Sequence, residues 1–94
     1  MENKITKDKL DKYFDVTKRA LKLAKISKER VKLKGARDDI LDMVERYFAD
    51  AKYFMDKGDY VTAFASLNYA HGWLDTGARL GIFDVHDSNL FTVD

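Results

Sequence analysis

Apolar side chains recur at intervals of three and four residues in three stretches of the chain, the spacing that places them on one side of a helix. The sequence holds no proline and five glycines, so few positions interrupt a helix. We predict three helices, over approximately residues 6–30, 36–57 and 60–81. The predicted fold class is therefore all-α, an antiparallel up-down-up three-helix bundle with a C-terminal tail.

The ends of these helices carry residues that start or stop helices. Thr6 is a candidate N-cap of the first helix. The sequence does not determine the residue at which that helix ends, because residues 27–34 suit a frayed helix as well as a connector. Gly35 is the residue there that most favours the end of a helix. Gly58 ends the second helix and Asp59 is a ready N-cap for the third. So short a turn makes the second and third helices antiparallel neighbours.

The third helix is apolar over a wide band, and the stretch Tyr60–Leu74 contains no charged residue. Its main stripe faces the bundle. A second row lies on roughly the opposite side and consists of Thr62, Ser66, Tyr69, Trp73 and Leu80. Exposed aromatic side chains in one patch are typical of protein-interaction surfaces. The same spacing also suits core packing, so both interpretations stay open.

Two glycines lie inside the third helix, at Gly72 and Gly77. Each costs about 1 kcal/mol relative to alanine, so we expect the backbone of another segment to approach closely at both positions. Gly81 is a candidate C-cap, after which apolar and polar residues are interleaved. We predict that this tail, residues 82–94, folds back on the bundle.

At 94 residues the chain has the length of one domain, spanning residues 1–94. The absence of cysteine excludes disulfides, thiolate nucleophiles and cysteine-based metal sites. The sequence shows no apolar run of about 20 residues and no signal peptide. We therefore expect a cytoplasmic protein that makes no contact with membranes.

Charge is divided unevenly along the chain. Residues 1–37 hold 13 Lys and Arg against 5 Asp and Glu, whereas residues 38–94 hold 4 against 11. Such asymmetry is typical of a nucleic-acid face, and Lys18, Lys22 and Lys25 are the candidate contacts. The alternative is that the basic first helix lies along the acidic hairpin, so that opposite charges meet at its edges.

A polar ridge follows the third helix, because His71, Asp75 and Arg79 stand four residues apart. A histidine held by a carboxylate is an arrangement that orients a general base or a metal ligand. The structural alternative is an Asp75–Arg79 ion pair, with His71 bonded to the second helix near Arg46 or Tyr47. No nucleophile motif, phosphate loop or paired-carboxylate spacing accompanies the ridge. We predict no catalytic residue, no metal site and no cofactor.

A longer pattern runs through residues 36–83. It contains Asp-Ala-x-x-Phe (50–54), Gly-Asp-Tyr (58–60), Tyr-Ala-His-Gly (69–72), Leu-Asp (74–75) and Arg-Leu-Gly (79–81). In these elements the chain resembles an uncharacterised archaeal family known as domain of unknown function 357. The resemblance implies a small helical-bundle protein from an archaeon, and it brings no activity, cofactor or catalytic residue with it. Residues 1–35 lie outside the resemblance.

The function these observations favour is a non-enzymatic helical module that binds a protein partner or a second copy of the chain. Its interaction surface joins the second row to the ridge and comprises Tyr69, Trp73, Leu80, His71, Asp75 and Arg79. The alternative is a nucleic-acid-associated protein that uses the basic first helix. A third hypothesis is an enzyme or metal protein built on the ridge.

Overall fold

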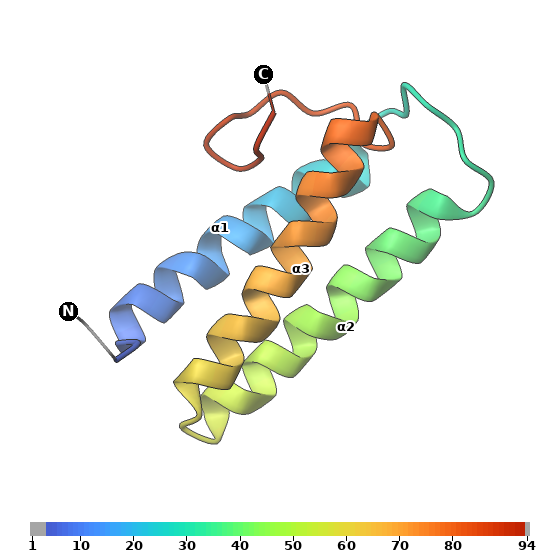
Figure 1. Cartoon of the computed structure of the whole chain (residues 1–94). Helices are drawn as coiled ribbons and strands as arrows, with labels where there is room; N and C mark the ends of the chain where they lie inside the picture. Colours follow the sequence, from blue (N-terminus) through green and yellow to red (C-terminus); the bar gives the residue numbers. More distant parts are fainter. Residues whose placement is uncertain (1–3, 94) are drawn as a thin grey trace.

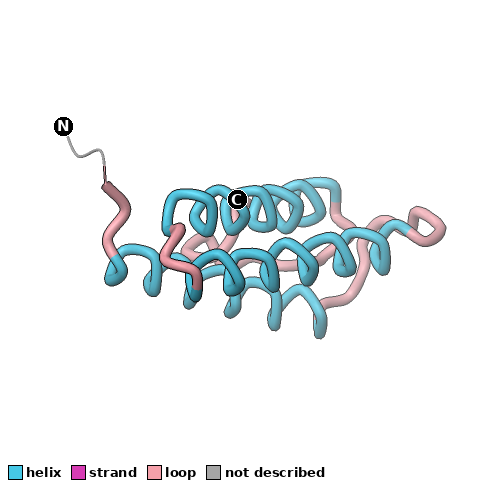
Figure 2. The backbone as a smooth tube through the Cα atoms, turned by 90° about the horizontal axis from the view of Figure 1, so that it is seen from below, coloured by secondary structure: helices cyan, strands magenta, loops and turns pink. Residues whose placement is uncertain are grey.

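The structure of the protein, a computed structural model, describes residues 4–93. It contains α1 (Lys7–Ile26), α2 (Ala36–Asp56) and α3 (Tyr60–Leu80). The chain runs up α1, down α2 and up α3 (Figure 1), and the three helices lie side by side (Figure 2). The predicted up-down-up all-α bundle is confirmed. Residues 1–3 and 94, the ends of the predicted domain and tail, lie outside the described residues.

The helix α3 is the central element of the bundle. Helix α2 makes the most extensive contact with α3, while α1 lies mainly on α3 and touches α2 at fewer places. One such place is the edge-on contact of Phe14 with Phe48, whose ring centroids are 5.5 Å apart. In the described part of the chain, no helix is both long and apolar enough to cross a membrane. Near the α2–α3 turn the core contains Leu10, Ala51, Ala63 and Leu67, and at the other end it contains Val44, Leu74 and the tail.

Helix α1 ends at Ile26, before the predicted residue 30. Side chains from outside the helix cap this end, because they form hydrogen bonds with its last backbone carbonyls. The Ser27 hydroxyl donates to the Ala24 carbonyl at 2.7 Å. From the first turn of α2, the Arg37 guanidinium donates to the carbonyls of Ala24 and Lys25 at 3.0 and 2.8 Å. A cation at this end also suits the helix dipole. The sequence analysis did not identify Arg37, whose partners lie 12 and 13 residues away.

The tail folds back on the bundle, as predicted, and lies over α1 in Figure 1. Its apolar residues Ile82, Phe83, Val85, Leu90 and Phe91 are buried. The backbone turns at Gly81, whose φ of 82° suits a glycine. The Gly81 carbonyl accepts hydrogen bonds from the N–H groups of Arg30 and Val31 at 2.8 and 3.0 Å, which ties the α1–α2 connector to the end of α3.

Phe83 explains one of the two glycines inside α3. A Cβ atom at Gly77 would lie 2.6 Å from Phe83 Cδ2, so another segment does approach closely at Gly77, but through a tail side chain and not through its backbone. At Gly72 the same prediction is wrong, because no atom lies within 4 Å of a Cβ placed there. The fold therefore requires a glycine at position 77 and accepts a larger residue at position 72.

The two glycines should respond in opposite directions to substitution by alanine. Gly77→Ala overpacks the Phe83 contact, at a typical cost of about 1–3 kcal/mol, which exceeds the gain in helix propensity. Gly72→Ala brings the gain in helix propensity without any new close contact, so it should raise the free energy of unfolding by up to about 1 kcal/mol. Urea denaturation of the two variants measures both effects. Equal changes in the two free energies would contradict this account of Gly77.

The α2–α3 turn gives a pH-dependent contribution to stability. Asp59 caps α3, and its carboxylate accepts from the Thr62 N–H at 3.1 Å. Hydrogen bonds from the Thr62 side chain and from its backbone N–H lower the pKa of Asp59. A carboxyl whose pKa is lower in the folded state stabilises the fold above its unfolded pKa of about 3.9, and the contribution is lost as the pH falls through the folded pKa.

Asp59→Asn keeps a capping side chain but removes the titration. We expect the melting temperature of the wild type to exceed that of Asp59→Asn at neutral pH, and the difference to vanish as the pH falls from about 5 to about 2. Thermal unfolding followed by circular dichroism across that range measures it. A difference that stays constant down to the lowest pH would show that the charge of Asp59 contributes nothing.

Candidate functional site

The polar ridge of α3 holds the tail. Arg79 Nη1 donates to the Thr92 carbonyl at 2.9 Å, and the Thr92 N–H donates to Asp75 Oδ1 at 2.9 Å. His71 Nε2 lies 2.6 Å from the Leu90 carbonyl oxygen. Three side chains of the ridge thus bind the backbone of two tail residues. The predicted Asp75–Arg79 ion pair is wrong, because the two side chains bind the two backbone groups of Thr92 instead.

His71 faces α1 and the tail, so its predicted bond to α2 near Arg46 or Tyr47 is wrong. Its Nδ1 lies 3.0 Å from the Thr17 hydroxyl. A carbonyl oxygen can only accept, so His71 Nε2 donates to Leu90, and Nδ1 forms the hydrogen bond with the Thr17 hydroxyl. Both ring nitrogens are therefore engaged in holding α1, α3 and the tail together.

The aromatic side chains of the predicted interaction surface form a short ladder across α2 and α3. The ring centroids of Tyr47 and Tyr69 are 4.5 Å apart, and those of Tyr69 and Trp73 are 6.3 Å apart. Tyr69 is 48% exposed, while Trp73 is half-buried and also packs against the core. Leu80 is 55% exposed but lies further along α3, away from the two tyrosines. The second row of α3, which was predicted as an interaction surface, is thus partly buried in the core and partly exposed.

A recess lies beside this ladder, over Gly72. A shallow groove of about 390 Å³ is lined by Asn68, Tyr69, Gly72, Trp73 and Thr76. A second groove of about 230 Å³, between α1 and α3, shares Asn68 and Gly72 with the first and reaches His71, Asp75 and Tyr13. The two grooves are therefore adjacent, and Asn68 and Gly72 border both of them.

Two of the three candidate nucleic-acid contacts, Lys18 and Lys25, lie among carboxylates. Lys25 forms an ion pair with Glu45 of α2, and Lys18 lines a groove together with Asp11, Asp15 and Asp56. The expectation that opposite charges meet at the edge of the hairpin thus holds at Lys25. Elsewhere α1 packs mainly on α3 and touches α2 at fewer places.

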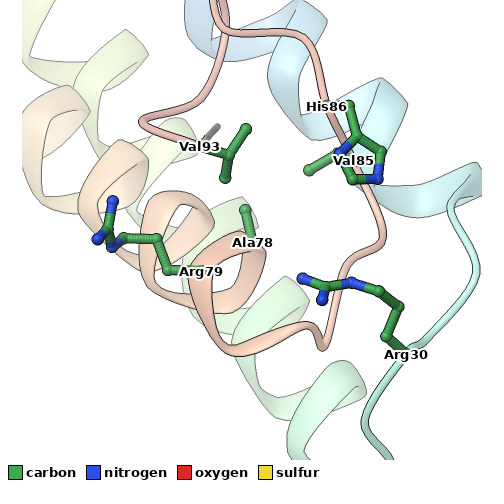
Figure 3. A pocket seen from close by; sticks show the side chains of 6 residues that line it. All are labelled: Arg30, Ala78, Arg79, Val85, His86 and Val93. Atoms are coloured by element: carbon green, nitrogen blue, oxygen red, sulfur yellow. The ribbon is translucent and has the colours of Figure 1, made fainter.

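A small pocket of about 190 Å³ lies where the connector, the end of α3 and the tail meet (Figure 3). Its polar side chains are engaged: Arg30 Nε and His86 Nε2 lie 3.2 and 2.9 Å from the same carboxylate oxygen of Asp84. Arg79 binds the Thr92 carbonyl, and Figure 3 shows its guanidinium turned away from Arg30. In the described part of the chain, no three His, Asp or Glu side chains gather in a way that could hold a metal ion.

Removal of one ridge side chain should loosen the tail. Asp75→Ala leaves the Thr92 N–H without its carboxylate acceptor, and we expect a loss of about 1–2 kcal/mol that appears mainly as faster amide hydrogen exchange in residues 90–92. Asp42→Ala is the control, because Asp42 pairs with Arg46 on the exposed side of α2 and such pairs contribute little. Unchanged exchange at Thr92 in Asp75→Ala would contradict the role assigned to the ridge.

Comparison with known proteins places the chain in a family. No curated protein and no solved structure matches it. A family model described as "Protein of unknown function (DUF357)" matches residues 12–83. The match begins within α1, so the sequence analysis was wrong to leave all of residues 1–35 outside the resemblance. Because the matched residues make up well over half of the chain, this protein belongs to the DUF357 family.

Proposed function

We propose that the protein is a non-enzymatic interaction module and that a helix of a protein partner docks across α3 at Gly72. The observation that carries the proposal is Gly72 itself. A glycine in the middle of a helix costs about 1 kcal/mol relative to alanine, and no neighbouring atom in the fold requires it. The recess that it leaves is open to a partner and allows its backbone to approach closely.

The exposed side of α3 supports this proposal through its composition. Its exposed residues between Tyr60 and Leu74 include Val61, Ala65, Asn68, Tyr69 and Gly72, and none of them is charged. Surface helices usually carry charged residues on the side that faces water. A strip without charges loses little hydration when a partner covers it, and Tyr69 and Trp73 beside the recess are the residue types that dominate binding energy.

The alternative of nucleic-acid association through α1 has less support. Two of its three candidate lysines lie beside carboxylates, which repel phosphate groups. The aromatic rings of α1, Tyr13 and Phe14, pack edge-on against Phe64 and Phe48, so they are not free to stack on bases.

Substitutions at Gly72 test the proposal without damage to the fold. Gly72→Leu fills the recess and should abolish capture of a partner by the tagged protein from extract of the native cells, while the variant stays folded. Ala49→Leu adds similar bulk to the exposed surface of α2 and should leave capture unchanged. Sedimentation velocity of the purified protein shows in the same variants whether the partner is a second copy.

Three results would contradict the proposal. Partners that persist in Gly72→Leu do not use the recess. If Ala49→Leu loses the same partners as Gly72→Leu, the loss is caused by added bulk anywhere on the surface and not by a filled recess. Partners that disappear after nuclease treatment of the extract would place the function on the basic helix α1.

A further inference from the structure

A different groove lies between α1 and the tail, which run next to each other in Figure 1. It has a volume of about 570 Å³. Leu23, Ile26 and Leu90 supply its apolar surface, with Leu90 buried and Ile26 80% exposed. The wall on the α1 side carries Arg19, Lys22 and Lys25. Aliphatic side chains bordered by a row of cations form an amphipathic surface.

The cations of this groove belong to a larger excess of positive charge. Residues 16–37 contain nine Lys and Arg and one acidic residue, Glu29. Within residues 4–93, this segment forms ion pairs with α2 at Lys25–Glu45 and with the tail at Arg30–Asp84, and Arg19 Nη1 lies 3.7 Å from Asp15 Oδ2 one turn earlier in α1. Lys22 forms no ion pair with another described residue, and the tail side of the groove carries Asp87. The groove therefore attracts a ligand of negative charge.

We propose that this groove binds an acidic amphipathic helix of a partner protein. Its aliphatic side chains would cover Leu23, Ile26 and Leu90, and its carboxylates would meet the cations of α1. Arg19, Lys22 and Lys25 are three residues apart, so successive cations are separated by about 4.5 Å along the helix axis. Acidic residues three or four positions apart on a partner helix have the matching spacing.

Other anionic ligands fit the groove less well. Single-stranded nucleic acid binds through aromatic platforms, and no aromatic side chain lines the groove. A membrane surface requires several protruding apolar side chains, whereas Leu90 is 6% exposed and Ile26 alone protrudes. A second copy of the chain offers α2 as its acidic helix, but the apolar residues of α2, among them Ile40 and Val44, are already buried against α3.

A synthetic peptide tests the proposal. The probe is a fluorescent helical peptide of about 20 residues with leucine along one face and glutamate three and four positions apart beside it. A peptide with glutamine in place of every glutamate is its matched control. Binding is measured by fluorescence anisotropy against the wild-type chain, Ile26→Ser, Lys22→Glu and Lys12→Glu. Lys12→Glu makes the same charge change on the exposed surface of α1, outside the groove.

We expect the glutamate peptide to bind at least about tenfold more tightly than the glutamine peptide, with an affinity that falls as salt rises. Ile26→Ser and Lys22→Glu should each weaken binding about tenfold, and Lys12→Glu should change it little. Circular dichroism confirms that each variant is folded, which is expected because all three positions are exposed.

The proposal is overturned if the two peptides bind equally, if neither binds, or if Ile26→Ser has no effect. Two further probes identify the competing ligands. Tighter binding to phosphatidylglycerol vesicles than to the peptide, lost in Ile26→Ser, would make the groove a membrane contact. Tighter binding of single-stranded RNA that depends on Lys22 and not on Ile26 would make it a nucleic-acid contact. Failure of these assays leaves the Gly72 recess untouched, because the two surfaces share no residue.

Discussion

The contact of Phe83 with Gly77 is the constraint on which the connector end of the bundle depends. Phe83 is completely buried, and the contact holds the chain against α3 just after that helix ends. Arg37 lies over the Phe83 ring, 5.5 Å from its centroid, while its guanidinium closes the C-terminus of α1. One ring therefore joins the end of α1, the start of α2, the end of α3 and the tail. Since α1 has limited contact with α2, this shared packing fixes how the helices converge.

Periodicity predicted the helices and the α2–α3 turn, because these depend on residues close together in sequence, and the interleaved apolar residues of the tail predicted its burial. It did not predict which neighbour the ridge of α3 faces. The spacing of His71, Asp75 and Arg79 shows that they share a side of the helix, but the rotation of α3 between α1 and α2 is set by packing. The end of α1 was missed for a similar reason, since the Arg37 cap comes from the next helix.

The structure divides the Tyr-Ala-His-Gly motif, residues 69–72, into two pairs. Ala70 is buried in the core and His71 binds Thr17 and Leu90, so the fold accounts for both. Tyr69 and Gly72 point outward and line the recess. Tyr69 contributes a ring contact to Tyr47, but Gly72 stabilises nothing within the chain. A motif with structural residues on its inner side and an unexplained glycine on its outer side is the reason to look for function on α3.

His71 connects the two proposed surfaces. It lines the groove that borders the Gly72 recess, and it binds the carbonyl of Leu90, whose side chain lies in the groove beside α1. The tail is held in place by backbone hydrogen bonds to the ridge and by its own buried side chains. Displacement of the tail would therefore remove Leu90 and Asp87 from the α1 groove. The residues that line the Gly72 recess all belong to α3, so the α1 groove includes part of the tail and the recess does not.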